Sequence, residues 1–417
     1  MPEPTSAEGD TTRSAEASTG AKTDTAWASS TYFAEGLPFS IVHKVSSEFL
    51  VHLGVSAQLV GLFQLAHVPW NLKFVWAPLV DRFGTTKRWM VAAQLAIAAC
   101  TLFLAAFAST FVPWAFGTGL MLIAVFAATN DIAVDGYFLR RLKKERQDSL
   151  AGVRVGAYRV ALMVGSGGIV TLGGLYGFQV AFGAAGLIMG GLALAHGVFL
   201  AKDRAEEGSS SVSGIVQRAA KSFFSQRGIG VAMVVLLTYR AGDALMFAMN
   251  AKFLAELGLS TATRGVINGT FGTVASIGGS LTGAAIIARV SFARAFVPIT
   301  AAQSGAILLY VLLAVTRPSL PFVAAVVLVE QFIAGVGISA FFVFITRLCQ
   351  GEQKATQYAF ASSLMSVAML GAGAGSGFLF ASFGSAKFFF VAFLASLPGM
   401  LATAFYKPNE ARTVIGG

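Results

Sequence analysis

Apolar stretches of about twenty residues alternate with short polar segments along nearly the whole chain. A helix needs about 20 apolar residues to cross the hydrocarbon core of a bilayer, because each residue adds only about 1.5 Å. The pattern therefore predicts an all-α membrane protein with about twelve transmembrane helices. We place these helices at residues 27–50, 57–80, 89–110, 112–138, 150–175, 178–200, 229–254, 261–288, 295–316, 320–346, 354–381 and 386–406.

The longest polar interruption, residues 202–228, leaves six predicted helices on each side. This equal division favours two related six-helix halves, at 27–201 and 229–406, and transporters built from repeats bind substrate where the repeats meet. We expect the interruption to be a cytoplasmic linker whose end lies along the inner leaflet as an amphipathic helix. Segments 1–26 and 407–417 are predicted to be cytoplasmic tails. The first should be disordered, because it is rich in Ser, Thr, Glu and Ala.

The composition agrees with a membrane location, since 55% of the residues are hydrophobic, 12% are charged, and the mean hydropathy is +0.71. Soluble domains carry about 25% charged residues. Lys and Arg follow predicted helices 2, 4 and 6 and are absent after helices 1, 3 and 5, which predicts that both termini are cytoplasmic in an inner membrane. The net charge of +10 follows from these loops and indicates contact with anionic lipid rather than nucleic acid.

Four charged residues fall at one depth in four predicted helices of the first half. Counted from the cytoplasmic end of each helix, Glu35, Lys73, Asp131 and Arg159 lie about 12–13 Å into the membrane. A charge near the bilayer centre costs about 2.5–3.5 kcal/mol on insertion scales, so these side chains should point inward and pair. We predict that Asp131 faces Lys73 or Arg159. A network that serves only to fix helix packing is the alternative.

A second acid, Asp135, lies one turn from Asp131 on the same helix face, nearer the cytoplasm. It could pass a proton between the charged level and the inner side of the membrane. We therefore expect the coupling proton to be taken by Asp131, Asp135 or Glu35, with Asp131 as the leading candidate.

The second half carries fewer polar residues inside its helices. Arg240 and Asp243 are three residues apart and can pair on one helix face. Glu330 lies in the outer half of predicted helix 10. Intramembrane ionisable residues are functional candidates by default, so we count all three among the groups that bind substrate.

The periplasmic end of predicted helix 1 is also polar, with His43, Lys44 and Glu48 in one short stretch. Lys44 and Glu48 are spaced to pair at i, i+4, and a cavity mouth here is a reasonable interpretation. His67, in the middle of predicted helix 2, is interpreted as a packing histidine. The chain contains no phosphate-binding loop, zinc motif or nucleophile elbow, so we expect neither a cofactor, a bound metal nor an enzymatic activity.

The stretch "GLFQLAHVPWNLKFVWAPLVDRFGTTKRW" (61–89) resembles the signature of helix 2 and its following loop in the major facilitator superfamily. The matching positions are Asp81, Arg82, Gly84, Lys87 and Arg88. The resemblance implies a fold of twelve helices in two halves and a cytoplasmic gate formed by these residues. Asp81 would then meet the basic residues after helix 4, Arg140 or Arg141.

A narrower resemblance runs through nearly all predicted helices. The fragments "GLPFS", "NLKFVWAPLVDR", "ATNDIAVDGY", "GAYRVALMVGSGG", "TYRAGDALMF", "VEQFIAGVGISAFF" and "ATQYAFASSL" are similar to the AmpG-type muropeptide permeases, relatives of the acetyl-coenzyme A transporters. That family imports anhydromuramyl sugars and peptides for cell-wall recycling, driven by the proton motive force. The resemblance places seven residues on the family's charged motif positions: Lys73, Asp131, Asp135, Arg159, Arg240, Asp243 and Glu330. Familiar members often carry two extra C-terminal helices, and Glu35, His43 and Lys44 replace small or neutral residues.

The expected function is therefore secondary transport of a small anionic solute with protons, by alternating access in a monomeric permease. Moving one charge inward across 100 mV supplies about 2.3 kcal/mol, enough for roughly fiftyfold accumulation. The alternatives are another anionic substrate, acyl-CoA-like or siderophore-like, a non-transporting receptor or assembly factor, and a membrane-embedded transferase. The substrate-binding candidates are Lys73, Arg159, Arg240, Asp243, Glu330, Lys44, His43 and Asn130.

Overall fold

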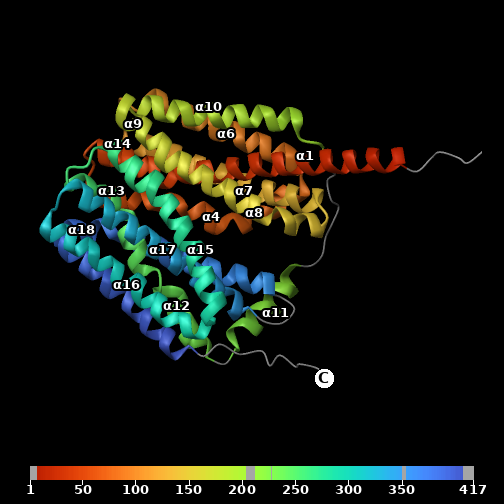
Figure 1. The fold of residues 1–417 in the computed structure, drawn as a ribbon. Coiled ribbons are helices and arrows are strands. Elements are labelled where there is room, and N and C mark those ends of the chain that lie inside the picture. The colour runs from red at the N-terminus through yellow and green to blue at the C-terminus, as the bar shows by residue number, and fades with distance from the viewer. Residues whose placement is uncertain (1–6, 203–211, 227, 350–353, 407–417) are drawn as a thin grey trace, which may run out of the picture. The chain divides into compact units, whose positions relative to one another are not determined.

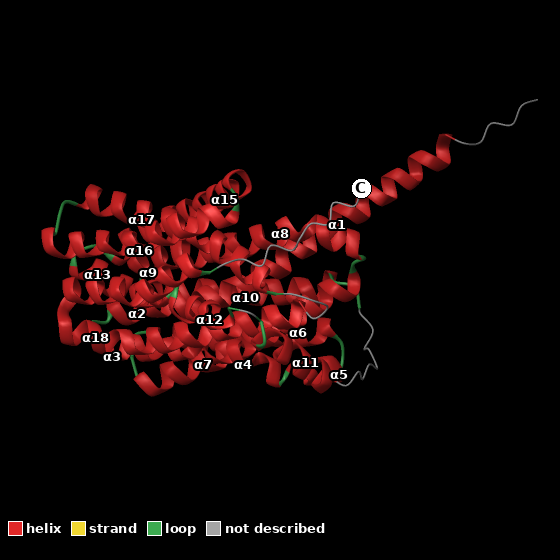
Figure 2. Cartoon of the chain, turned by 90° about the horizontal axis from the view of Figure 1, so that it is seen from below, coloured by secondary structure: helices red, strands yellow, loops and turns green. Residues whose placement is uncertain are grey.

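The computed structural model describes residues 7–202, 212–226, 228–349 and 354–406, and every regular element in these ranges is helical (Figure 2). The all-α fold class is confirmed. Contacts divide the chain into two compact units: residues 1–41, 72–165 and 179–207 form the first, and residues 42–71, 166–178 and 208–417 form the second.

In the first unit α1 packs against α7 and α8, and α6 packs against α7. Aromatic side chains fill the core between them, with the rings of Trp27 and Tyr137 at 5.2 Å and those of Tyr32 and Phe138 at 5.7 Å. The helices that fall wholly or mainly in this unit are α1 (Ala7–Ser40), η3 (Lys73–Val75), α5 (Ala77–Arg82), α6 (Thr86–Phe107), α7 (Pro113–Arg141), α8 (Lys144–Met163) and α10 (Phe178–Phe199).

In the second unit α12, α13 and α16 pack along the long helix α18, and α15 packs against α17 (Figure 1). Two further contacts join segments far apart in sequence, α3 with α18 and α9 with α14. The helices that fall wholly or mainly in this unit are η1 (Ile41–Val45), α2 (Ser46–His52), α3 (Ala57–Leu62), η2 (Phe63–His67), α4 (Val68–Leu72), η4 (Val164–Ile169), α9 (Val170–Tyr176), α11 (Val212–Phe224), α12 (Ile229–Thr238), α13 (Ala241–Glu256), α14 (Thr261–Arg264), η5 (Gly265–Phe271), α15 (Gly272–Val290), α16 (Phe292–Thr316), α17 (Leu320–Leu348) and α18 (Lys354–Phe405).

Nine helices in the described residues are long and apolar enough to cross a membrane. One of them, α18, contains Gly384 at φ 69° and ψ 167°, so it consists of two helices joined at that residue. The run from α1 to α2 and the broken run from α3 to α5 lie where the first two membrane helices are predicted. Twelve crossings are therefore compatible with the structure.

Two of the predicted membrane helices are interrupted where charged residues occur. Pro38 lies inside α1, and the five residues that follow the helix, including Lys44, form the π-helical segment η1. The run that carries Lys73 is broken twice into 3₁₀ turns, with Pro69 and Pro78 on either side of it. Proline removes a helical hydrogen bond, and π and 3₁₀ segments inside helices are frequent at functional sites.

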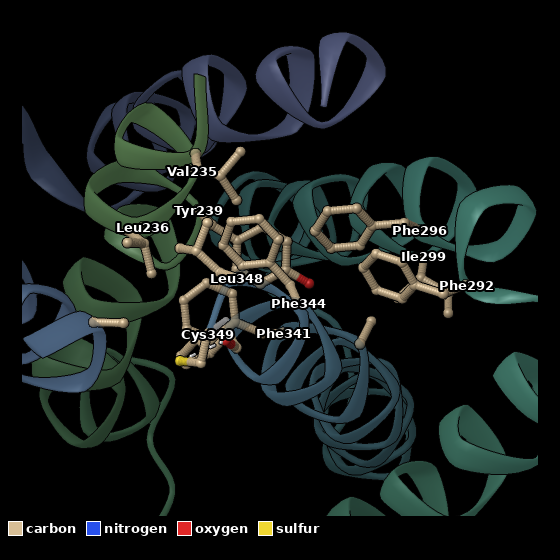
Figure 3. Close-up of a cluster of buried hydrophobic side chains, with 14 of the residues drawn as sticks. Val235, Leu236, Tyr239, Phe292, Phe296, Ile299, Phe341, Phe344, Leu348 and Cys349 are labelled. Carbon is tan, nitrogen blue, oxygen red and sulfur yellow. Dashed lines mark hydrogen bonds between the residues drawn. The ribbon is translucent and has the colours of Figure 1, made fainter. Parts of the chain in front are cut away.

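A cluster of buried hydrophobic and aromatic side chains lies in the second unit (Figure 3). The ring of Tyr239 stacks on Phe341 with centroids 4.8 Å apart, and Phe296 lies 6.3 Å from the same ring. The Tyr239 hydroxyl donates to Gln303 Oε1 at 2.7 Å and lies 3.1 Å from the carbonyl of Gly337. The cluster thereby fixes the Gln303 amide inside the second unit.

Candidate functional site

The first unit contains a charge cluster that joins four helical segments. Lys73 Nζ, on η3, lies 3.7 Å from Asp131 Oδ2, on α7. Arg154 Nη2, on α8, lies 2.8 Å from Asp135 Oδ1, on α7. Asp131 is buried, whereas the side chain of Lys73 is 38% exposed. The predicted contact of Asp131 with Lys73 is present.

Glu35, on α1, completes this cluster. Its Oε2 atom is buried and accepts no hydrogen bond from the residues that the structure describes. The charges that act on it are the acids Asp131 and Asp135 and the bases Lys73 and Arg154. We call these five residues the charge cluster. It holds three carboxyl groups and two cations, so one negative charge is in excess when every acid is ionised.

Aromatic groups hold the Asp135 side of the charge cluster. The Tyr32 hydroxyl donates to Asp135 Oδ1 at 2.8 Å. The Arg154 guanidinium lies 4.4 Å from the centroid of the Tyr32 ring and 4.6 Å from that of Phe138. Each cation–π contact contributes about 0.5–2 kcal/mol, depending on how far it is desolvated. Arg159, also on α8, is half-buried and acts electrostatically on Tyr158.

Asn130 lies in a buried chain of hydrogen bonds, which we call the amide network. Asn130 Nδ2 donates to the carbonyl of Ala34 at 3.2 Å, and its Oδ1 accepts from Gln94 Nε2 at 3.0 Å. Gln94 Oε1 lies 2.8 Å from His196 Nδ1, and His196 Nε2 lies 3.1 Å from Ser30 Oγ. Because Gln94 Oε1 can only accept, Nδ1 of His196 must carry a proton. The network ties α1, α6, α7 and α10 together.

The second unit holds the other predicted polar residues. Arg240 Nε lies 3.6 Å from Asp243 Oδ2, so the pair predicted from the spacing is present. Gln303 Nε2 donates to the same oxygen. Arg240 occupies the N-cap position of α13 without a side-chain capping bond, and Asp243 lies in the first turn, where a carboxylate is favoured by the helix dipole.

Glu330 is buried on α17 beside a row of polar groups. Its Oε2 atom accepts from Gln331 Nε2 at 3.2 Å and from the Tyr310 hydroxyl at 3.5 Å. That hydroxyl accepts from Asn250 Nδ2 at 2.8 Å, and Asn250 Oδ1 accepts from Asn268 Nδ2 at 3.2 Å. These hydrogen bonds between side chains connect α13, η5, α16 and α17.

The polar stretch after Pro38 differs from the expected pairing. Glu48 binds Arg264, whose Nη2 lies 2.7 Å from Glu48 Oε2, and not the lysine four residues before it. Lys44 Nζ instead lies 3.6 Å from the centroid of the Phe247 ring. The π-helical turn around Lys44 changes the side-chain direction that regular i, i+4 geometry assumes.

His43 and His67 form a hydrogen bond between their rings, with His43 Nε2 2.7 Å from His67 Nδ1. The ring of Trp70 stacks on His67 with centroids 5.7 Å apart. His67 is therefore not only a packing residue, because its ring nitrogen also forms a polar contact.

The predicted gate residues lie at the ends of helices in the first unit. Lys87 Nζ donates to the carbonyl of Leu200 at 2.5 Å, and the Arg82 guanidinium lies 5.8 Å from the ring of Phe83. Arg88 lies in the first turn of α6, where its backbone N–H donates to the side chain of the N-cap residue Thr85, and Arg140 and Arg141 lie in the last turn of α7. The side chain of Asp81, the acid of the predicted gate, lies outside the described part of the structure.

The family model of the Major Facilitator Superfamily matches residues 28–372. The chain belongs to the major facilitator superfamily. The fold of this superfamily member is also found in solved structures, including the nucleoside transporter NupG, with a TM-score of 0.73 and 12% identity over 92% of this chain and all of that one. A bacterial homolog to the human lysosomal transporter Spinster gives a TM-score of 0.69 and 13% identity over 92% of this chain and 94% of that one.

Sequence relatives of this superfamily member include the anhydromuropeptide permease of Escherichia coli (strain K12), 27% identical over 388 residues, which cover 88% of this chain and 77% of the permease. The putative transporter AmpG 4 of Rickettsia conorii (strain ATCC VR-613 / Malish 7) is 24% identical over 347 residues, which cover 80% of this chain and 84% of that one. The predicted resemblance to AmpG-type permeases is confirmed at this level of identity. The chain is a multi-pass membrane transporter of a small molecule.

Two arginines were missed in the sequence. Arg154 lies close to the predicted cytoplasmic end of its helix, where a basic residue is ordinary, so depth alone did not single it out. Arg264 lies at the start of its predicted helix and pairs with an acid 216 residues away. The one signal in the sequence is Glu48, an acid at the end of predicted helix 1, because a carboxylate buried there needs a basic partner.

Proposed function

We propose that this chain is a proton-coupled symporter of the inner membrane that imports anhydromuropeptides for peptidoglycan recycling. The names of its relatives support the substrate class, and the basic loops support an orientation with both termini in the cytoplasm. In this proposal the cell supplies the driving force through protons, and the chain supplies the groups that bind the proton and the substrate.

The charge cluster is the observation that carries the proposal. Its three carboxyl groups share two cations inside a membrane protein, and the oxygen Oε2 of Glu35 is buried without a hydrogen bond among the described residues. Burying an uncompensated negative charge is costly. With one proton bound, the two remaining carboxylates balance the two cations of the cluster, so the cluster is neutral. A site that needs one proton for neutrality, and can lose it when a partner moves, is what proton coupling requires.

Asp131 is the proposed loading site, and Asp135 and Glu35 assist it. The long 3.7 Å contact of Asp131 with Lys73 is a weak bond that an incoming carboxylate or phosphate can replace. Once Lys73 binds the substrate, its attraction for Asp131 weakens, which favours binding of a proton by Asp131. Asp135 keeps its own partners, Arg154 and Tyr32, and lies one turn nearer the predicted cytoplasmic side.

Substrate anions are proposed to meet Lys73 and Arg159 in the first unit and Lys44 and Arg240 in the second. Asn130 in the first unit, and His43, Asp243 and Glu330 in the second, are proposed to add polar groups that bind substrate. The cytoplasmic gate is proposed to consist of Asp81, Arg82, Lys87, Arg88, Arg140 and Arg141, and its opening would release the substrate inside.

Uptake into proteoliposomes tests the proposal directly. Radiolabelled anhydromuropeptide should accumulate when the outside is made acidic and should equilibrate without accumulating when the pH gradient is collapsed. The matched control is the Asp24→Asn variant, which removes an acid from an ion pair with Arg146 outside the predicted spans. Accumulation that ignores the pH gradient would contradict proton coupling. No uptake of anhydromuropeptide, with uptake of another anionic solute, would contradict the substrate class.

A further inference from the structure

The second unit contains two ionisable side chains, Lys44 and Glu330, that form no ion pair within the described residues. Lys44 Nζ lies 3.6 Å from the centroid of the Phe247 ring and makes no hydrogen bond to the described chain. Glu330 Oε2 accepts only from neutral groups, those of Gln331 and Tyr310, and its Oε1 accepts from none of the described residues. Ionisable side chains inside a membrane protein normally pair or reach water, so both can take a further partner.

The charged groups that act on this lysine and this glutamate have partners of their own. Glu48, which attracts the lysine, binds Arg264, whose Nη2 lies 2.7 Å from Glu48 Oε2. Asp243, which repels the glutamate, lies 3.6 Å from Arg240 Nε. The lysine and the glutamate also attract each other, but no ion pair joins them in the described part of the chain. One cation and one acid are therefore left without an ionic partner in the same unit.

One face of α13 connects these two groups. Phe247, which lies under Lys44, and Asn250 are three residues apart on α13 and therefore share a helix face. Asn250 Nδ2 donates to the Tyr310 hydroxyl at 2.8 Å, and that hydroxyl lies 3.5 Å from Glu330 Oε2. The cation and the acid are thus both attached to the same turn of α13, without touching each other.

Two π-helical segments bring further polar groups to this face. Lys44 belongs to η1, and Asn268, whose Nδ2 donates to Asn250 Oδ1 at 3.2 Å, belongs to η5. Such segments inside helices are frequent at functional sites. Phe247 is 41% exposed, and Lys44 and Asn268 are half-buried, so the protein leaves part of this surface uncovered.

We propose that Lys44 and Glu330 select a ligand that carries both a carboxylate and an ammonium group, with Lys44 binding the carboxylate and Glu330 the ammonium. A ligand with both charges gives each side chain an ionic partner through charge-assisted hydrogen bonds. A ligand with only one charge leaves the other side chain unpaired, which disfavours its binding. The selection rests on the proposed transport function, in which the peptide of the anhydromuropeptide supplies both groups.

Equilibrium binding to the purified protein in detergent tests this selection without a proton gradient. The probes are a radiolabelled anhydromuropeptide whose peptide has a free amine and a free terminal carboxyl, the same compound with the amine acetylated, and the same compound with the terminal carboxyl amidated. The unaltered protein should bind the unmodified compound about tenfold or more tightly than either derivative, because hydrogen bonds between charged groups contribute more than neutral ones.

Two variants assign each preference to its residue. Lys44→Gln should abolish the preference for the free carboxyl and keep the preference for the free amine. Glu330→Gln should do the reverse. The matched control is Lys252→Gln, which removes a cation of α13 that donates to the carbonyl of Val55, and it should keep both preferences.

The outcomes separate this selection from the proposed transport function. Equal binding of the three compounds by the unaltered protein would refute the selection and leave the transport function in place. A variant that lowers both preferences by the same factor would refute it as well, because a general distortion of the site has that effect. Binding of none of the compounds would overturn the substrate class and the selection together. Should Glu330→Gln fail to fold, the three compounds on the unaltered protein and on Lys44→Gln still decide.

Discussion

The amide network allows the loss of folding stability in its variants to be predicted. The loss follows from the number of stranded groups, by which we mean buried polar atoms left without a hydrogen-bond partner. His196→Leu leaves one buried acceptor, Gln94 Oε1, without its donor, because Ser30 Oγ also lies 3.0 Å from the carbonyl of Trp27 and keeps that bond. Gln94→Leu strands two groups, Asn130 Oδ1 and His196 Nδ1. The double variant strands only Asn130 Oδ1.

Interhelical hydrogen bonds in membrane proteins contribute about 0.6 kcal/mol on average and up to about 1.7 kcal/mol. A stranded buried group costs about 1–3 kcal/mol. Taking about 1 kcal/mol for each stranded group, we expect losses of about 1 kcal/mol for His196→Leu, about 2 kcal/mol for Gln94→Leu and about 1 kcal/mol for the double variant. The interaction energy of the cycle is then about −2 kcal/mol.

Equilibrium unfolding of the detergent-solubilised protein, followed by tryptophan fluorescence, measures these values. Uptake per folded molecule should change little in the three variants if the network only holds helices in place. Losses that add to about 3 kcal/mol in the double variant would refute the network, because additivity means that the two side chains do not share a bond. A large rise in the KM of His196→Leu with normal stability would instead favour direct substrate binding through Asn130.

Three further predictions use other parts of the chain. Arg154→Gln should impair proton-driven accumulation more than Arg154→Lys, because lysine keeps the positive charge near Asp135 even though it loses the stacking on Tyr32. Equal activities of the two variants in the uptake assay would contradict this. Gly384→Ala should cost about 1–3 kcal/mol in unfolding measurements, because φ 69° and ψ 167° form a backbone conformation that essentially only glycine adopts. Gly375→Ala, in the first of the two helices that form α18, should cost nothing, and at neither position would a Cβ meet another atom; equal effects would contradict the strain argument. A cysteine at Ser210, in the predicted cytoplasmic linker, should escape an impermeant thiol reagent on intact cells, and labelling there would overturn the predicted orientation.

Depth counting along the sequence predicted part of the charge cluster. Lys73, Asp131 and Glu35 come together because charged groups at one level of a membrane protein can only pair with one another. The spacing of Arg240 and Asp243 likewise predicted a contact within one helix. These inferences need only the rise per residue and the cost of burying charge.

The partners of Glu48 and Asp135 could not be predicted in this way. Glu48 pairs with Arg264, on a helix far along the chain, and the regular i, i+4 spacing pointed to Lys44 instead. The π-helical turn after Pro38 departs from that regular spacing, and Arg264 comes from a segment that only the fold brings close. Both depend on tertiary packing, which a single sequence does not specify. The division into two six-helix halves and the roles of the site residues stay predictions.

Transport by the Asp131→Asn variant is the most direct test of the central claim that this acid carries the coupling proton. The account predicts that the variant in proteoliposomes no longer accumulates anhydromuropeptide against its gradient, yet exchanges labelled for unlabelled substrate at a rate close to that of the unaltered protein. Exchange needs the binding surface but no net proton movement. The Asp24→Asn control should do both. Accumulation driven by the pH gradient that survives in Asp131→Asn would contradict the account.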